Sequence, residues 1–304
     1  MASTAPLTFD GRVVVVTGAG RGLGRSHALA FAERGARVVV NDPGAGLDGR
    51  GSSAGPADEV VAEIAARGGE AVADRSDIST PEGAQALVDG AVGAFGRLDV
   101  LVNNAGILRD ASLPKLGDDD VRRVIEVHLL GSIWTCRAAW PHLRESGHGR
   151  IVNTTSVAGY LGNFGQANYG AAKGGLIALT KVLAVEGARH GIRANAVAPG
   201  ARTRMTEALL GDLVDRMDPA LVSSAVVWLA HEECEASGEV FAVAAGRVAR
   251  VFVAQSRGHF SPTLTPEEVR DNWDRVMDVA DPVMPATVAD ELALLREHLQ
   301  SVRG

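Results

Sequence analysis

The apolar residues of this chain fall into short runs rich in valine and isoleucine, separated by longer segments with apolar residues at helical spacing. Six such runs lie at residues 13–16, 37–41, 70–73, 98–102, 151–155 and 192–197. Continuous β-branched runs of this length are typical of parallel strands that are buried on both faces. The alternation of strands and helices predicts an α/β fold of Rossmann type, with a doubly wound parallel sheet.

The predicted helices have recognisable ends. One covers residues 57–67 and ends at Gly68-Gly69, and another begins after Thr80-Pro81 and reaches residue 95. A long helix is predicted from about residue 118 to 143, and it carries His128. A further helix begins at Tyr169 and extends to about residue 190. Glycine after the last helical residue and proline at the first are the expected end signals.

The first strand leads into a glycine-rich turn, which reads TGAGRGLG at residues 17–24 and precedes a helix. Strand, glycine turn and helix in this order are the context that a dinucleotide fingerprint needs. Gly18 allows the tight turn, Gly22 lets the backbone approach a pyrophosphate, and Gly24 permits close helix–strand packing, with Arg21 and Leu23 in the same loop. The helix N-terminus adds N–H groups and a favourable dipole. The alternative is a glycine-rich turn without a ligand.

Acidic residues follow the second and third strands. Asp42 is placed to bind the adenosine ribose hydroxyls and to repel a 2′-phosphate, which favours NAD over NADP, although Arg21 acts in the opposite sense. Asp42 can instead be a turn or cap residue ahead of Pro43. Asp77, followed by Ile78, can bind the adenine amino group or cap the next helix. The long loop at residues 43–56 is either a cofactor or partner loop or a surface loop.

Small and amide residues follow the fourth strand as Asn103-Asn104-Ala105-Gly106. They suit contact with a cofactor and, equally, the cross-linking of neighbouring strands by buried amides. The sixth strand ends at Pro199-Gly200, and the next segment, residues 201–205 with Thr203, is expected to cover the nicotinamide as a lid.

Three residues form the candidate catalytic set. Tyr169 and Lys173 are four apart on a helix and therefore project from one face. A phenol has a pKa near 10, and a neighbouring ammonium lowers it, so that proton transfer to a substrate oxygen becomes practical. Ser156 ends the fifth strand, where a hydroxyl can point into the ligand crevice of an open α/β sheet. Without the other motifs, a Tyr-x-x-x-Lys pair more often lies on the solvent-exposed face of a helix and has no catalytic role.

Composition narrows the function classes. The chain has 304 residues, a net charge of −7 and 46% hydrophobic content, which permits one large α/β domain and argues against a nucleic-acid partner. Two cysteines suggest neither a disulfide framework nor a metal cluster. No signal peptide, apolar run of membrane-spanning length or peroxisomal tripeptide is expected, so we expect a soluble cytoplasmic protein without a membrane partner.

In combination, these motifs resemble the short-chain dehydrogenase/reductase family over roughly residues 8–246. The resemblance rests on TGxxxGxG from Thr17, NNAG from Asn103, Ser156, Tyr169-x-x-x-Lys173 and Pro199-Gly200. It implies about seven parallel strands and a nicotinamide cofactor. It also implies that Tyr169 is the acid/base, that Ser156 holds the substrate oxygen, and that Lys173 binds ribose and lowers the pKa of Tyr169. Members are usually dimers or tetramers, so a homo-oligomer is expected.

One position departs from the family pattern. Many members carry an asparagine on the long helix, where it helps to organise a water and proton path, and this chain has His128 there. A histidine can serve the same relay because it is both donor and acceptor. It can equally be a buried structural residue, and both readings stay open.

The C-terminal part resembles a narrower branch, the dehydrogenase part of the peroxisomal multifunctional enzymes of type 2, also called 17β-hydroxysteroid dehydrogenase type 4. The resemblance rests on VND ending at Asp42, His128, residues 228–235 and 238–241, and PEEVRDNW from Pro266. It implies oxidation of (3R)-hydroxyacyl-CoA to 3-oxoacyl-CoA with NAD. A 17β-hydroxysteroid dehydrogenase, an NADPH-dependent 3-oxoacyl reductase and a silent nucleotide-bound sensor are the alternatives.

We expect two parts: residues 1–246 as the nucleotide-binding and catalytic part, and residues 247–304 as an extension packed on the same domain or on a dimer partner. Thr265-Pro266-Glu267-Glu268 is a capping box that opens a helix through Val269, Trp273 and Val276. Leu292, Leu295 and Leu299 predict a final helix. These helices either cover apolar surface or shape a pocket for a long acyl chain or sterol.

Overall fold

The computed structural model describes residues 5–51, 55–202 and 215–301. The expected lid position Thr203 lies outside the described residues. The chain divides into two compact units, Met1–Arg250 and Val251–Gly304, which are treated separately below. Among the helices that the structure describes, none is long and apolar enough to cross a membrane.

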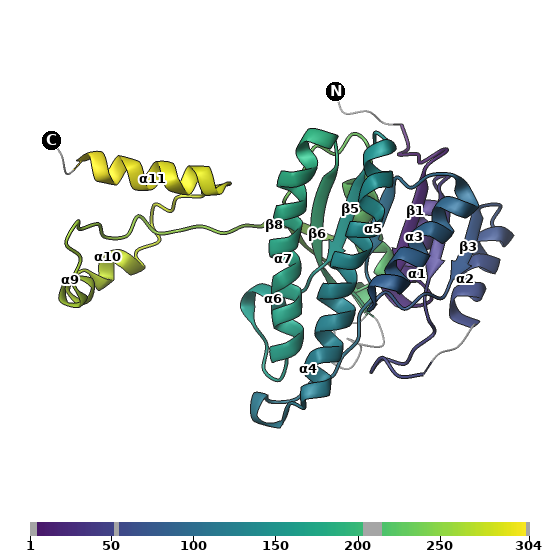
Figure 1. Cartoon of the computed structure of the whole chain (residues 1–304), viewed down its shortest axis with the longest axis horizontal. Coiled ribbons are helices and arrows are strands. Elements are labelled where there is room, and N and C mark those ends of the chain that lie inside the picture. Colours follow the sequence, from purple (N-terminus) through teal and green to yellow (C-terminus); the bar gives the residue numbers. More distant parts are fainter. Residues whose placement is uncertain (1–4, 52–54, 203–214, 302–304) are drawn as a thin grey trace. The chain divides into compact units, whose positions relative to one another are not determined.

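An eight-stranded sheet forms the centre of the first unit, in the order β3-β2-β1-β4-β5-β6-β7-β8 (Figure 1). Every neighbouring pair from β3 to β7 is parallel, which confirms the predicted doubly wound α/β fold. The strand order reverses between β1 and β4, and ligands of such sheets bind outside the carboxyl ends of the strands at this point. The strands are β1 Val13–Thr17, β2 Arg37–Asn41, β3 Glu70–Asp74, β4 Val100–Asn103, β5 Arg150–Thr154, β6 Arg193–Gly200, β7 Val240–Ala244 and β8 Arg247–Val251.

The last strand adds to the expected seven. Only Ala245 and Gly246 separate β7 from β8, with φ of 48° and 80°. Positive φ at both central residues is typical of the tight hairpin turn that matches strand twist. Because a two-residue turn reverses the chain, β8 runs antiparallel to β7. Arg250 on β8 forms an ion pair with Glu239, just before β7.

Helices cover both faces of the sheet (Figure 1). Successive side chains of a strand point to opposite faces, so Val14 and Val16 enter one hydrophobic core and Val13 and Val15 the other. The first core receives α1 (Gly22–Ala32), α2 (Gly55–Ala66) and α8 (Pro219–Ala230), and the second receives α3 (Pro81–Phe95), α5 (Gly131–Glu145) and α7 (Ala167–Gly187). The runs of consecutive valines are therefore explained by burial on both sides.

The predicted long helix contains a change of helix type. It begins as α4 (Asp118–Ile125), continues through a π-helical turn, η2 (Glu126–Leu130), and ends as α5. His128 lies within the π-helical turn. Such turns are rare and occur frequently at functional sites. The 3.6-residue pattern of the sequence did not predict it.

Buried amides connect the middle of the sheet to the helices. Asn103 Nδ2 donates to Asn153 Oδ1 at 3.0 Å, which links the ends of β4 and β5. Asn153 Nδ2 donates to Thr180 Oγ1 on α7 at 2.9 Å, and Thr135 Oγ1 on α5 donates to Asn103 Oδ1 at 2.7 Å. Asn103 therefore has the structural role that the sequence left open, since it does not line the cavity described below.

The second unit contains three helices, α9 (Pro266–Asp271), α10 (Trp273–Met277) and α11 (Val288–Ser301). The capping box is confirmed: Glu268 N donates to Thr265 Oγ1, and Thr265 N donates to Glu268 Oε2. The prediction of one helix through residue 276 is wrong, because the backbone breaks at Asn272. No side chain described in residues 251–297 is buried.

The amide network yields a stability prediction. Asn153→Leu keeps a similar volume but removes partners from Asn103 and Thr180, so we expect the free energy of unfolding to fall by about 1–3 kcal/mol. Urea unfolding monitored by circular dichroism measures it. The same substitution at the exposed Asn163 is the control and should change stability by less than about 0.5 kcal/mol. Equal losses for both variants would contradict a structural role of the network.

Candidate active site

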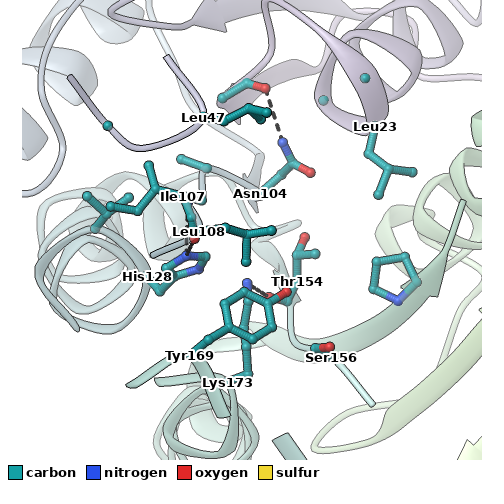
Figure 2. A pocket seen from close by; sticks show the side chains of 18 of the residues that line it. Leu23, Leu47, Asn104, Ile107, Leu108, His128, Thr154, Ser156, Tyr169 and Lys173 are labelled. Carbon is teal, nitrogen blue, oxygen red and sulfur yellow. Dashed lines mark hydrogen bonds between the residues drawn. The ribbon is translucent and has the colours of Figure 1, made fainter. Parts of the chain in front are cut away.

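A cavity of about 660 Å³ lies outside the carboxyl ends of the strands. Figure 2 shows the side chains that surround its catalytic end. Among the described residues that were assigned to cofactor binding or catalysis, all except Gly200 line it: Gly18, Arg21, Gly22, Leu23, Gly24, Asp42, Asp77, Ile78, Asn104, Ala105, Gly106, His128, Ser156, Tyr169, Lys173 and Pro199. Thr203 is outside the described residues. Gly200 packs against β7 instead, where an added Cβ would lie 2.8 Å from Ala244 Cβ, and Ala201 lines the cavity.

The glycine loop is shaped by three requirements for small residues. Gly18 and Gly22 have φ of 62° and 55°, a region that residues with a side chain rarely adopt. A Cβ on Gly24 would lie 2.2 Å from Gly18 O, so helix α1 can approach the loop only with glycine here. The loop therefore presents backbone at the N-terminus of α1, where N–H groups and the helix dipole favour a phosphate group. This geometry fits the pyrophosphate of a dinucleotide.

Asp42 has the turn role that the sequence left as one alternative, and its position leaves the ribose role possible in addition. Its Oδ2 accepts a hydrogen bond from Gly20 N at 2.9 Å, and its Oδ1 accepts one from Gly44 N at 2.7 Å. The carboxylate thus fixes the glycine loop and the turn after β2. It also lines the cavity, and each carboxylate oxygen can accept a further hydrogen bond. Asp42 can therefore fold the loop and still bind a ribose.

The glycine-rich loop after Asp42 closes over the cavity as a strap, which we define as residues 43–50. Leu47 O accepts a hydrogen bond from Leu108 N at 3.0 Å, and Asp48 O accepts one from Arg109 Nε at 2.8 Å. Gly49 lies against Ile107, with an added Cβ only 3.1 Å away. The strap thus connects the end of β2 to the segment after β4 and forms one wall of the cavity, as a cofactor loop would.

Asp77 is held by a partner that the sequence did not reveal. Its Oδ2 accepts from Arg123 on α4 at 3.0 Å, and its Oδ1 accepts from Ser79 N at 3.0 Å. Although burial acts in the opposite direction, the hydrogen bonds with Ser79 and Arg123 and the charge of Arg123 together lower the pKa of Asp77. The alternative role as a helix cap is not seen, since Thr80 caps α3 by accepting from Gly83 N.

The residues after β4 are fixed to the glycine loop. Asn104 Nδ2 donates to Thr17 O at 2.9 Å and to Gly18 O at 3.2 Å. Thr17 Oγ1 accepts from the backbone N–H groups of Asn104 and Ala105, both at 3.0 Å. A Cβ on Gly18 would lie 2.7 Å from Ala105 Cα. The two strand ends at the switch point therefore form one rigid wall of the cavity.

Tyr169 and Ser156 meet in the cavity from opposite elements, α7 and the end of β5 (Figure 2). Burial raises the pKa of the Tyr169 phenol above 10, and the charge of Asp110 adds to this effect. Hydrogen bonding to Ser156 lowers the pKa in part. The phenol therefore favours its neutral form near neutral pH, and a cation beside it would favour the phenolate.

Lys173 is the cation in this part of the cavity, and it is buried, with 3% of its surface exposed. Its Nζ donates to Thr154 O at 2.6 Å and lies 5.5 Å from the centre of the Tyr169 ring (Figure 2). Burial lowers the pKa of Lys173 from 10.5 to about 7. An ammonium has three donors, so two remain for a ligand beyond the bond to Thr154.

His128 is buried next to Tyr169, with the two rings edge to face and their centres 5.2 Å apart. Its Nε2 lies 2.8 Å from Ile107 O and 2.9 Å from Ile107 N. Its Nδ1 is buried and has no hydrogen-bond partner among the described residues. Burial and the charge of Lys173 hold the pKa of His128 well below 6.5, so the ring is neutral. The π-helical turn therefore delivers a neutral imidazole with one unused nitrogen to the cavity.

Several cavity residues were not predicted. Thr154 is the most informative, because its buried Oγ1 has no hydrogen-bond partner within the described ranges and lines the cavity. The sequence did not mark Thr154 as a site residue, because threonine is common in strands. Three basic residues follow strand ends and could by their charge meet the phosphates of a CoA: Arg109, Lys115 and Arg202. None of the three lines the cavity. Arg109 is instead paired with Asp120 at 3.1 Å.

Comparisons with known proteins agree with this geometry. The sequence profile of the short chain dehydrogenase family matches residues 12–212. Peroxisomal multifunctional enzyme type 2 from Mus musculus is 46% identical over 303 residues, which are 98% of this chain and 41% of that protein. The hydroxyacyl-CoA dehydrogenase ChsB1 from Mycobacterium tuberculosis is 41% identical over 288 residues, 90% of this chain and 87% of that protein.

A solved structure gives the same result in three dimensions. The full-length peroxisomal multifunctional enzyme type 2 from Drosophila melanogaster matches with a TM-score of 0.81 and 38% identity, over 97% of this chain and 51% of that chain. The chain thus spans about half or less of the multifunctional enzymes that it resembles, and most of the length of the ChsB1 protein.

The buried lysine yields a pH prediction. Below pH 7 both folded and unfolded Lys173 are protonated, and the folded state carries the full cost of burying the charge. Between pH 7 and 10.5 only the unfolded state keeps the proton, so the stability of the wild type rises with pH relative to Lys173→Met, by about 1.4 kcal/mol per pH unit. Urea unfolding of both proteins between pH 6 and 10 measures this difference, with the exposed Lys181→Met as the control. Parallel curves for wild type and Lys173→Met would contradict the lowered pKa.

Proposed function

The chain belongs to the short-chain dehydrogenase family, and from that premise we propose that it oxidises a secondary alcohol to a ketone with NAD. The substrate that we propose is a (3R)-3-hydroxyacyl-CoA, and the product is the 3-oxoacyl-CoA. The observation that carries the proposal is the convergence of Ser156, Tyr169 and Lys173 on one cavity, beside a glycine loop at the N-terminus of α1. As an oxidoreductase of this family, the protein needs a proton acceptor, an oxygen-binding group and a dinucleotide site in contact, and all three line this cavity.

In the proposed mechanism Tyr169, as phenolate, takes the proton of the substrate hydroxyl. In the free protein the hydrogen bond with Ser156 lowers the pKa of Tyr169. With substrate bound, the single O–H of Ser156 donates to the substrate oxygen and fixes it. Lys173, held by Thr154 O, binds the nicotinamide ribose and, in its protonated form, favours the phenolate through its charge. A bound nicotinamide would supply the acceptor for the hydride that leaves the carbon bearing the substrate hydroxyl.

For the cofactor we propose NAD rather than NADP. The support is the carboxylate of Asp42, which bonds the backbone of Gly20 and lines the cavity next to the glycine loop. A 2′-phosphate there would meet a negative charge in a partly dehydrated site. Arg21 also lines the cavity and favours the phosphate, but Asp42 is held in place by two backbone hydrogen bonds.

The acyl-CoA assignment is supported by the relatives named as hydroxyacyl-CoA dehydrogenase and multifunctional enzyme type 2. Oxidation of a 17β-hydroxysteroid is the alternative that uses the same catalytic residues, and only a substrate comparison separates the two. An NADPH-dependent 3-oxoacyl reductase is disfavoured by Asp42. A silent sensor is disfavoured by the complete set of Ser156, Tyr169 and Lys173 in one cavity.

We also propose a homodimer or homotetramer in the cytoplasm, with residues 1–246 carrying catalysis and residues 247–304 as an extension. The half-exposed side chains of Leu292, Leu295 and Leu299 on α11 support an extension that covers another surface. The multifunctional relatives are named as peroxisomal, so the cellular site of this chain is tested by fractionation of cells that express it. A monomer mass in solution would contradict the oligomer.

The catalytic assignment predicts the behaviour of one variant. Tyr169→Phe should lower kcat by about a factor of 100 to 10,000, because it removes the proton acceptor and little else. The Kd for NAD, measured by calorimetry, should stay within about threefold, since the ring remains in place. Tyr160→Phe, at a half-buried tyrosine that does not line the cavity, is the matched control and should keep its rate. An unchanged kcat of Tyr169→Phe would contradict this mechanism.

The proposed role of His128 as a proton relay has a separate test. We propose that its unused Nδ1 passes a proton between the Lys173 region and water. His128→Asn restores the residue type that many family members carry and should keep most of kcat, whereas His128→Leu should lose at least about tenfold. The pH profile of kcat should change only for the leucine variant. Similar kcat and pH profiles in both variants, with similar melting temperatures, would make His128 a purely structural residue.

A further inference from the structure

We propose that four apolar side chains at the mouth of the cavity form a docking surface for the apolar chain of the substrate. They are Leu113, Val157, Leu161 and Phe164, and we call them the apolar rim. This inference rests on the proposed function, because the occupant to which it commits is the acyl chain of a hydroxyacyl thioester.

The rim is unusual in its exposure. Leu113, Leu161 and Phe164 are 72%, 75% and 90% exposed, and Val157 is 44% exposed. Single exposed apolar residues are common and need no explanation. These four differ because they lie on two loops that are joined to each other and because Val157 and Leu161 also line the cavity. Apolar groups that continue from a ligand cavity onto the surface suit a ligand with an apolar tail.

The two loops that carry the rim are fastened side by side. Ala111 N donates to Gly165 O at 2.9 Å, and Ala111 and Gln166 form a parallel bridge. Gln166 Nε2 also donates to Asp110 Oδ2 at 2.7 Å. Leu113 follows Ala111 by two residues, and Phe164 precedes Gln166 by two residues. The bridge therefore places Leu113 and Phe164 close to one seam, next to the cavity residues Asp110 and Gln166.

The rim is also fixed relative to the catalytic residues. Val157 immediately precedes the short helix α6 (Ala158–Leu161), and Leu161 is its last residue. This helix packs on α7. A Cβ on Gly159 would lie 2.8 Å from the backbone carbonyl carbon of Lys173, so α6 touches α7 at the catalytic lysine itself. Figure 1 shows α6 beside α7. The part of the rim on α6 is thus packed directly against the helix that carries Tyr169 and Lys173.

The exposed Phe164 lies on a loop between two glycines with positive φ. Gly162 and Gly165 on either side of it have φ of 73° and 80°, which residues other than glycine rarely adopt. The loop is therefore shaped by two glycines and fastened by the Ala111 bridge, and in this shape it leaves the Phe164 ring exposed. The acyl chain of a substrate whose hydroxyl oxygen is held by Ser156 would leave the cavity across Val157 and Leu161, and it would reach Phe164 and Leu113 only if it were long.

Chain length is therefore the variable that tests the rim. The experiment measures kcat/KM of the wild type for (3R)-3-hydroxyacyl-CoA with acyl chains of four, eight, twelve and sixteen carbons, below the micelle concentration of each. Each methylene that contacts the rim should raise kcat/KM by about two- to fourfold, until the rim is covered. The double variant Leu113→Ser/Phe164→Ser should lose about tenfold or more with the sixteen-carbon substrate and less than about twofold with the four-carbon one.

The matched control is Leu113→Met/Phe164→Leu, which keeps the surface apolar and should keep the wild-type profile. A profile of the wild type that does not rise with chain length would overturn the rim as a docking surface while leaving the proposed function in place. The rim would also be overturned as a docking surface if the serine variant lost kcat/KM equally with all substrates, or if its kcat/KM values matched those of the wild type. A serine variant that changes only the mass in solution would assign the rim to a second copy of the chain. No turnover of any acyl-CoA by the wild type would remove the proposed function and this inference together.

Discussion

A buried ammonium beside a partly buried phenol is the arrangement on which the rest of this structure depends. Lys173 has given up almost all of its contact with water, and its one described hydrogen bond is to the carbonyl of Thr154. Such burial is costly, and it lowers the pKa of Lys173 to about 7. The position is nevertheless rigid, because Thr155 Oγ1 donates to Lys173 O at 2.7 Å and Gly159 lies against the same backbone. The fold thus holds a destabilised cation where a developing phenolate would need it.

The sheet explains how this position is reached. Because β1 to β7 are parallel, their carboxyl ends lie at one edge, and the segments that follow them line one cavity. Buried valines on both faces make the strands stable without polar side chains, so the polar groups can gather at the ends. Asn103, Asn153 and Thr180 then connect the middle strands to the helix that carries Lys173. Stability and chemistry share the same elements, but they use different side chains.

The sequence predicted the parts that follow from local pattern. Continuous valine runs gave the buried strands, and the glycines at 18, 22 and 24 gave a loop whose positive φ and close approach only glycine allows. The helical spacing of Tyr169 and Lys173 correctly placed both on one helix face. Long-range partners could not be predicted in this way. Arg123 is 46 residues from Asp77, and the strap contacts the segment after β4 through backbone atoms, which leave no residue signature. The π-helical turn at His128 was not predicted either, because it departs from the 3.6-residue period of an α-helix. The strand β8 was also not predicted; it follows a two-residue turn at Ala245 and Gly246.

The central claim is that this cavity binds NAD and a (3R)-hydroxyacyl thioester so that Tyr169, Ser156 and Lys173 act on one hydroxyl. The most direct measurement is the absorbance at 340 nm of the purified protein with NAD or NADP, against a (3R)-hydroxyacyl-CoA and a 17β-hydroxysteroid. The account predicts rapid formation of NADH from the acyl-CoA, with kcat/KM at least about tenfold higher for NAD than for NADP, as expected from an unfavourable charge contact of about 1.4 kcal/mol or more. Turnover of the steroid alone, preference for NADP, or no reduction with either substrate would contradict it.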